Sequence, residues 1–312
     1  MRLTRHGFAL VELLVALGIT ALVGGVIFRL VDRSQRFARG IAAIADQRAQ
    51  LAVAAYAVET ELQGAAPTDG DLIAPSDSAI AYLGKVGSAV ACNVAGSAID
   101  LAPPNLASGI TISWWNTAPQ AGDSVLVLDE GGSRSAADDR WLHLAASGVT
   151  SLPNACLYSP YVDSIADAGK VGWRITTVTP LPLTVVSGAA VQVVRPQRFA
   201  LYRSASEWML GWTEWNPLTG AWNVIQPVAG PLLPYAAGAA TSGPATSGPA
   251  ISGFALAWRD SLGVSLPAGA AGLPRSVSLT FGAITRQAVR MDGLRWGHRR
   301  DSLSRHIALR TP

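Results

Sequence analysis

The most apolar segment of the chain runs from Phe8 to Phe28, and Glu12 is its only charged residue. At about 1.5 Å per residue, a helix of this length would span roughly 30 Å, which matches the hydrocarbon core of a bilayer. The segment is longer than the apolar core of a cleaved secretory signal, which has about 7 to 15 residues. Residues 8–28 are therefore predicted to form a transmembrane helix in contact with membrane lipid.

Helical spacing continues beyond the apolar segment, through residues 29–66. No proline interrupts residues 29–63, and Gly64 and Pro67 mark an end. Apolar residues recur in this stretch near the helical period, at Leu30, Phe37, Ile41, Ile44, Leu51, Ala55, Val58 and Leu62. We predict one helix from Phe8 to about Gln63, roughly 84 Å long, with a lipid-facing half at 8–28 and an amphipathic half at 29–66. A separate short helical hairpin is the alternative, but no turn pattern supports it.

The period of the pattern changes in residues 67–312. Short runs rich in β-branched and aromatic residues alternate there with Gly, Pro, Asn or Asp, and we interpret eight of them as strands. These runs are 109–115, 124–130, 173–180, 190–194, 198–203, 208–215, 253–260 and 275–281. Because no helix-length pattern separates them, an antiparallel β-sheet-rich domain is expected. The fold class is α+β, with a long N-terminal helix followed by this domain.

Two segments of the predicted domain stand out by composition. Residues 236–252 repeat an ATSGPA-type unit, which buries too little apolar surface to pack alone, and we interpret them as a surface loop within one domain. Four tryptophans surround the predicted turn at 216–220, namely Trp208, Trp212, Trp215 and Trp222. A carbohydrate-binding or partner-binding patch is one interpretation of this cluster, and half-buried sheet residues are the favoured one.

Charge is sparse and unevenly distributed. Charged residues make up 14% of the chain and the net charge is +3, whereas residues 286–312 contain seven arginines and two aspartates. Such a basic tail suits an acidic partner subunit or lipid head groups, and nucleic acid is the least favoured of the three partners. A solvated tail without a partner is the preferred interpretation.

Cys92 and Cys156 are the only cysteines. If residues beyond the apolar segment lie outside the cytoplasm, an oxidising compartment allows these two thiols to form a disulfide. Two free, buried thiols are the alternative. Two cysteines without clustered histidines do not make a zinc site.

The sequence offers little for catalysis. The four histidines, His6, His143, His298 and His306, are scattered, and the common hydrolase, phosphate-loop and zinc-protease motifs are missing. Residues 128–140 gather Asp129, Glu130, Asp138 and Asp139, but without the spacing of a calcium loop, so a solvated acidic loop is favoured. We therefore predict no catalytic residues, no cofactor and no metal, and expect that the protein is not an enzyme.

Glu12 is costly in a membrane unless a cation neutralises it or it lies near the interface, where it would snorkel to water. A free amino group at Phe8, created by cleavage after Gly7, would lie at a suitable depth. The stretch from Gly7 to Glu12, after a short leader with Arg2 and Arg5, resembles the processing signal of type IV prepilins and type II secretion pseudopilins. That signal has a small residue before the cut, an aromatic or Met residue after it, and Glu at the fifth mature position.

This resemblance implies several expectations. Residues 1–7 would be a leader that a prepilin peptidase removes between Gly7 and Phe8, and Phe8 would then be N-methylated. Glu12 would pair with the amino terminus of a neighbouring subunit during assembly. The chain would start as a single-pass inner-membrane protein, with its N-terminus cytoplasmic and its C-terminal domain periplasmic, and would then enter a pilus or pseudopilus.

The segments at 47–65, 91–96, 198–204, 253–264 and 301–312 also resemble, more loosely, PilW-type minor pilins and J-type pseudopilins. That resemblance implies a pilin-like fold, partnership with other minor pilins or pseudopilins and with an inner-membrane assembly platform, and a role in priming or capping the filament. The alternative is a single-pass membrane-anchored periplasmic enzyme or binding domain.

Overall fold

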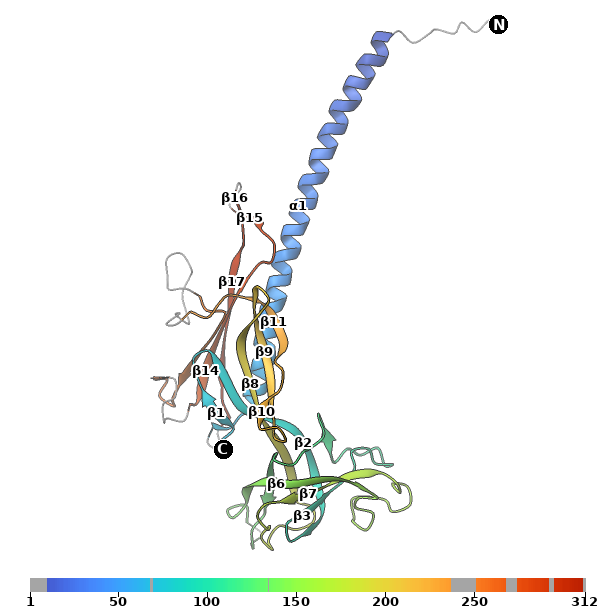
Figure 1. Cartoon of the computed structure of the whole chain (residues 1–312), viewed down its shortest axis with the longest axis vertical. Helices are drawn as coiled ribbons and strands as arrows, with labels where there is room; N and C mark the ends of the chain where they lie inside the picture. The colour runs from blue at the N-terminus through green and yellow to red at the C-terminus, as the bar shows by residue number, and fades with distance from the viewer. Residues whose placement is uncertain are drawn as a thin grey trace, which may run out of the picture.

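The computed structural model describes residues 10–67, 70–133, 135–236, 251–267, 274–291 and 295–310. The chain has an α+β fold, in which one long helix precedes a large antiparallel sheet (Figure 1). The helix, α1, runs without interruption from Leu10 to Gln63, about 80 Å along its axis. The predicted continuous helix and its end at Gln63 are therefore confirmed, and the hairpin alternative is wrong.

Seventeen strands follow within the described residues. Their bounds are β1 Leu72–Pro75, β2 Ala79–Ala95, β3 Ala98–Leu101, β4 Trp114–Trp115, β5 Ser124–Asp129, β6 Arg140–Pro153, β7 Val171–Thr177, β8 Ala190–Ser204, β9 Glu207–Asn216, β10 Ala221–Trp222, β11 Gln226–Leu232, β12 Phe254–Arg259, β13 Ser265–Leu266, β14 Ser276–Ile284, β15 Val289–Met291, β16 Arg295–Gly297 and β17 Arg300–Ala308. The β15–β16 hairpin forms a separate two-stranded sheet, and all the other strands belong to one sheet.

The first of two hydrophobic cores forms where α1 packs on the sheet, and we call this part the helix lobe. The helix contributes its buried stripe, Leu51, Ala54, Ala55, Val58 and Leu62. Strands β9, β11, β12, β14 and β17, with the adjoining ends of β2 and β8, supply the other face, including the stacked rings of Phe254 and Phe281. Polar bonds fix the contact, because the Gln47 amide donates to the carbonyl of Ala283 at 2.8 Å and Gln50 accepts from the Gly230 amide at 3.1 Å.

The second core lies beyond the C-terminal end of α1, in what we call the distal lobe. Here β2, β3, β7, β6, β5 and β8 pair in that order, and β8 pairs back with β2 to close an antiparallel ring of six strands. Smaller β-branched and aliphatic residues fill it, among them Val86, Ile99, Val125, Ile175 and Val193. A closed ring leaves no unpaired edge among these strands, so this core needs no helix to cover it.

The two lobes share one long strand pair. Residues 79–85 of β2 and 194–200 of β8 pair in the helix lobe, and residues 87–90 and 190–193 pair in the distal lobe, with a bulge between Lys85 and Gly87. On its other edge, β8 changes partner at this level, from β5 to β9. The shared pair makes the sheet continuous, and the partner change is where the two lobes diverge.

The structure refines the predicted strands. Only Trp114–Trp115 of the run 109–115 is a strand, and the runs 190–194 and 198–203 belong to one strand, β8. Pattern analysis missed β2 because it is rich in Ala and Gly. It also missed β17, which was interpreted as a solvated basic tail. That interpretation is wrong for residues 300–308, which pair along their whole length with β14 and bury Ile307.

Candidate functional site

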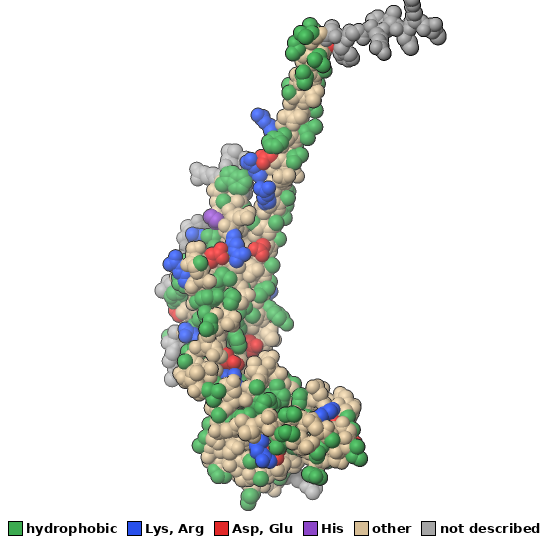
Figure 2. Space-filling view, turned by 45° about the vertical axis from the view of Figure 1, so that its right-hand side comes forward, with side chains coloured by type: hydrophobic (Ala, Val, Ile, Leu, Met, Phe, Trp, Pro, Cys, Tyr) green, Lys and Arg blue, Asp and Glu red, His purple; other side chains and the backbone are tan. Residues whose placement is uncertain are grey.

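The N-terminal part of α1 is exposed and apolar. Within the part of the chain that the structure describes, its leucines, isoleucines and valines are all exposed, and Leu10 and Phe28 are 76% and 74% exposed. By length and hydropathy the helix is able to cross a membrane. Figure 2 shows this stretch as a bare rod of hydrophobic side chains that projects from the body of the protein. An apolar surface of this extent requires a cover, either lipid or other helices.

Glu12 lies in the first turn of the described helix, with its side chain exposed. A carboxylate at a helix N-terminus is favoured by the positive end of the helix dipole. Gly7 and Phe8, the predicted cleavage and methylation residues, lie outside the described residues. The roles predicted for these three residues therefore stay predictions.

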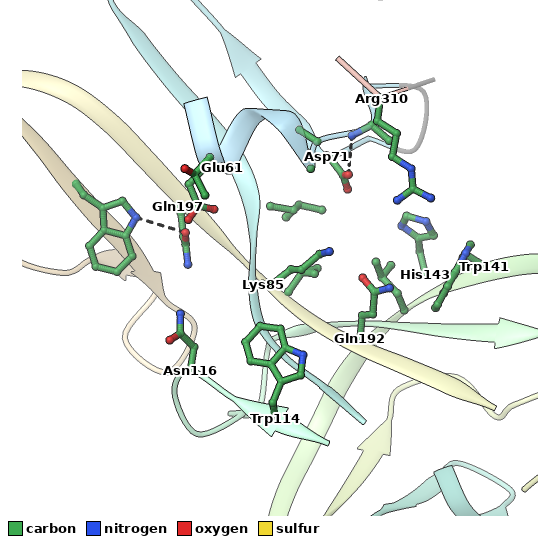
Figure 3. Close-up of a pocket in the computed structure, with 18 residues that line it drawn as sticks. Glu61, Asp71, Lys85, Trp114, Asn116, Trp141, His143, Gln192, Gln197 and Arg310 are labelled. Atoms are coloured by element: carbon green, nitrogen blue, oxygen red, sulfur yellow. Dashed lines mark hydrogen bonds between the residues drawn. The ribbon is translucent and has the colours of Figure 1, made fainter. Parts of the chain in front are cut away.

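A cavity of about 360 Å³ opens at the junction of the two lobes. Its residues come from the C-terminal end of α1, from β2, β4, β5, β6, β8 and β9, and from the end of the chain. In Figure 3, Lys85 lies between Trp114 on one side and Gln192 and His143 on the other, and Arg310 lies beyond Asp71. The wall is therefore mixed, with exposed indoles, amides and both signs of charge. Such a set of groups suits a polar ligand.

Burial changes the acidity of groups at one end of this cavity. Desolvation raises the pKa of Glu61, although its side chain keeps contact with solvent, and the nearby Tyr82 hydroxyl and the charge of Lys85 oppose that shift. Burial, and then the nearby charge of Glu61, raise the pKa of Tyr82. The Tyr82 hydroxyl and the Trp212 indole both donate to the side-chain oxygen of Gln197, at 3.0 and 3.3 Å.

A buried ionic cluster lies at the point on β8 where its pairing changes from β5 to β9. Arg195 donates to both carboxylate oxygens of Asp123, at 2.6 and 2.8 Å, and to Glu214 at 3.0 Å. Asp123 directly precedes β5 and Glu214 lies on β9. The guanidinium therefore links β5, which pairs with β8 up to Val194, to β9, which pairs with β8 from Gln197 onward. Arg195 and Asp123 are 3% and 1% exposed. Sequence reasoning missed this cluster because its members lie far apart in the chain.

The predicted disulfide is present. Cys92 on β2 is bonded to Cys156 in the loop after β6, with their Cα atoms 5.5 Å apart. The alternative of two free thiols is wrong. Asp167 reinforces the same region, because its carboxylate accepts from the amides of Ala107 and Asp163 at 2.6 and 2.9 Å.

The acidic segment 128–140 uses its carboxylates locally. Asp129 is 1% exposed and pairs with Arg140 at 3.1 Å, while Asp138 accepts hydrogen bonds from the amide and hydroxyl of Ser133. Within the described part of the chain, no three His, Cys, Asp or Glu side chains come together in a way that would hold a metal. His298 and His306 lie against Thr285 and Ser278, apart from His143 in the cavity.

The tryptophan cluster is part of the sheet. Three of the four lie on β9 and are half-buried, namely Trp208, Trp212 and Trp215. Trp222 on β10 is exposed, and its ring contacts the ring of Trp215 edge to face, with the ring centroids 5.6 Å apart. The favoured interpretation, half-buried sheet residues, is confirmed for the three on β9. Of the low-complexity stretch 236–252, residues 237–250 lie outside the described residues.

Comparison with protein-family models, with curated proteins and with solved structures found no match to this chain.

Proposed function

We propose that this chain is a minor pilin or pseudopilin, matured by a prepilin peptidase and built into a filament of a type IV pilus or a type II secretion system. One observation carries the proposal. Glu12 lies near the start of an exposed apolar helix half that continues without a break into a buried half, directly after a Gly7–Phe8 junction and a basic leader. A plain membrane anchor needs none of these three residues.

The proposed mechanism is structural rather than catalytic. Lipid of the inner membrane covers the apolar half of α1 before assembly, and helices of partner subunits cover it in the filament. Apolar contact supplies most of the affinity, and the pair between Glu12 and a neighbour's amino terminus sets the axial register. The bulky distal lobe favours a priming or capping position beside other minor subunits over a place in a densely repeated shaft.

Processing provides the first test of this function. Protein isolated from its native host should begin at an N-methylated Phe8, as measured by mass spectrometry of the intact chain and of its N-terminal peptide. An intact Met1, or a cut beyond residue 20, would support the simple membrane anchor instead.

Replacement of Glu12 tests the mechanism. Glu12→Gln should leave cleavage and membrane insertion intact, because the peptidase reads the junction and the span only becomes more apolar. Assembly should slow or fail, since an ammonium left unpaired in a low-dielectric setting costs up to about 3 to 5 kcal/mol. Glu12→Asp should restore assembly in part, because the shorter side chain keeps the charge and loses reach. Co-immunoprecipitation with partner subunits and a count of surface filaments measure the effect, and normal assembly by Glu12→Gln would contradict the mechanism.

The cavity at the lobe junction favours a second candidate, a membrane-anchored binding domain. It differs from the first by requiring an intact N-terminus and a soluble ligand. Turnover of a substrate that is abolished by a change at His143 or Glu61 would reverse the ranking and would make the chain an enzyme.

A further inference from the structure

A band of charge follows the apolar half of α1. Residues 29–39 carry four arginines and one aspartate, a net charge of +3, and the exposed apolar residues Leu30 and Val31 lie between Arg29 and Asp32. Asp32 neutralises part of this charge, because it pairs with Arg36 at 2.6 Å on the same helix face. Arg39 is exposed.

The β15–β16 hairpin lies beside the helix at this level. In Figure 1 the hairpin is the part of the sheet region that reaches farthest toward the N-terminal half of α1. Between hairpin and helix is a pocket of about 150 Å³, lined by Arg36, Arg39, Gly40, Gln287, Ala288, Val289 and Trp296. Val289 closes its base at 3% exposure, and the Trp296 indole is 55% exposed at its rim. A segment near the C-terminus therefore completes a basic, aromatic pocket on the N-terminal helix.

The position of the pocket relative to the membrane follows from the distance along the helix axis. Arg36 and Arg39 lie about 7.5 and 12 Å beyond Val31 along the axis. Side chains on a helix lean toward its N-terminus, which brings both guanidinium groups several ångströms back toward the apolar half. The headgroup layer extends roughly 5 to 8 Å beyond the hydrocarbon core on each side. With the core edge at Val31, three residues beyond the predicted span 8–28, the long Arg29 side chain extends to the headgroups and the pocket opens into the headgroup layer.

We propose that this pocket binds the phosphate of an anionic phospholipid in the leaflet next to the folded domain. A guanidinium presents paired donors that match phosphate oxygens, and Arg39 is the main ligand because Arg36 is already paired with Asp32. Tryptophan is enriched at the membrane interface, where its ring is apolar and its N–H is hydrated, which suits Trp296 at the rim. The inference rests on α1 crossing a membrane, and it holds equally for a filament subunit and for a plain anchor.

The test uses the full chain in nanodiscs that contain equal amounts of phosphatidylglycerol and phosphatidylcholine. Native mass spectrometry of the released protein measures which lipid is retained. The wild-type chain should retain phosphatidylglycerol preferentially, and Arg39→Gln should lower that preference about fivefold, the effect of one basic residue near an anionic surface. Arg39→Lys should retain part of it, because the charge stays and the paired donors are lost.

Arg48→Gln is the matched control. Arg48 is an exposed arginine on the same helix, about 13.5 Å beyond Arg39 and outside the pocket, and it should leave the preference unchanged. A full preference in Arg39→Gln, or an equal loss in Arg48→Gln, would overturn the proposal. Displacement of the lipid by inorganic phosphate would also overturn it, because the site would then bind free anions rather than lipid. Each outcome is independent of whether the chain is cleaved after Gly7, so failure here does not bear on the filament proposal.

Discussion

The helix lobe and the distal lobe each cover an apolar sheet face, but they do so in different ways. The helix lobe has large core side chains such as Tyr82, Phe254 and Phe281, and its sheet is covered by the C-terminal half of α1. The distal lobe has smaller core side chains, covers its sheet by closing it into a ring, and adds the Cys92–Cys156 bond. The first core therefore depends on the long N-terminal helix, whereas the second contains no residue of it.

Under the proposed function, this difference suits a subunit whose helix moves from lipid into a filament. In the proposed filament subunit, transfer of α1 from lipid to a helix bundle would act directly on the helix lobe through Gln47, Leu51 and Val58. It would reach the distal lobe only through the shared β2–β8 pair and the Arg195 cluster. The cavity opens at this same junction, so both lobes shape its wall.

The largest effect should come from a charge placed in the helix interface. Val58 is fully buried, so Val58→Asp would place a carboxylate without a partner in the core and should cost several kcal/mol, enough to detach α1 from the sheet. Tyr56→Asp is the control, since Tyr56 is 73% exposed on the same helix. Hydrogen exchange should rise throughout the helix lobe of Val58→Asp while the distal ring stays protected. Equal loss of protection in both lobes would show that they form one cooperative unit.

Removal of the disulfide should have the next largest effect, and in the other lobe. The bond closes a loop with a sequence separation of 64, worth about 4 kcal/mol in the chain-entropy model. The Cys92→Ala/Cys156→Ala double variant should lose hydrogen-exchange protection in β3, β6 and β7. Protection of α1 and β14, and membrane insertion, should stay as in the wild type. Stronger deprotection of the helix lobe than of the ring would contradict the division between the lobes.

Acidification should destabilise the two lobes at different pH values, with a smaller effect than either substitution above. In the distal lobe, burial opposes ionisation of Asp100, but hydrogen bonds from Arg174 and Asn93 outweigh it and lower its pKa. Backbone amides, first those of Ala166 and Ala107 respectively, lower the pKa values of Asp163 and Asp167. Groups with lowered pKa stabilise the fold above their unfolded pKa of about 3.9, and this stabilisation is lost as the pH falls through their folded values.

Glu61 behaves in the opposite sense. The pKa of Glu61 is raised in the folded state. Its contribution to folding stability is therefore largest below its unfolded pKa, and is lost as the pH rises through its folded pKa. Below about pH 4 the distal lobe should therefore weaken before the helix lobe. Pepsin digestion at stepped pH, read by mass spectrometry, should give first cuts in residues 98–177. First cuts in the helix lobe would contradict the prediction that the distal lobe loses stability first. In Asp100→Asn the acid sensitivity should decrease, because the titrating group is gone.

The sequence predicted the long helix well because its pattern is local. An uninterrupted apolar run, a helical period and the Gly64–Pro67 break each act within a few residues, so α1 and its end at Gln63 could be found without any tertiary contact. The same holds for β5, β9, β12 and β14, whose β-branched and aromatic content is strong. The disulfide was predicted because only two cysteines exist, although their distance was unknown.

Other features depended on contacts between distant segments. β2 has weak strand propensity, and β17 has a charged face that hid its pairing with β14. Both become strands because neighbouring strands supply their hydrogen bonds and a covered face, which is a tertiary effect. The pocket between α1 and the β15–β16 hairpin combines Arg39 with Trp296. The Arg195 cluster combines residues from β8, β9 and the segment before β5. No local pattern relates such residues.

The sequence by itself determined that one apolar helix with Glu12 near its start precedes a β-rich domain, because hydropathy and period are properties of neighbouring residues. The tertiary structure alone decided that the domain has two cores joined by one strand pair, and that the basic C-terminal segment folds back onto the N-terminal helix. Strand pairing joins residues as far apart as Ala79 and Ala200, and contacts between helix and sheet join residues more than two hundred positions apart, such as Gln47 and Ala283. The free energy that selects these contacts comes from burial that exists only in the folded chain.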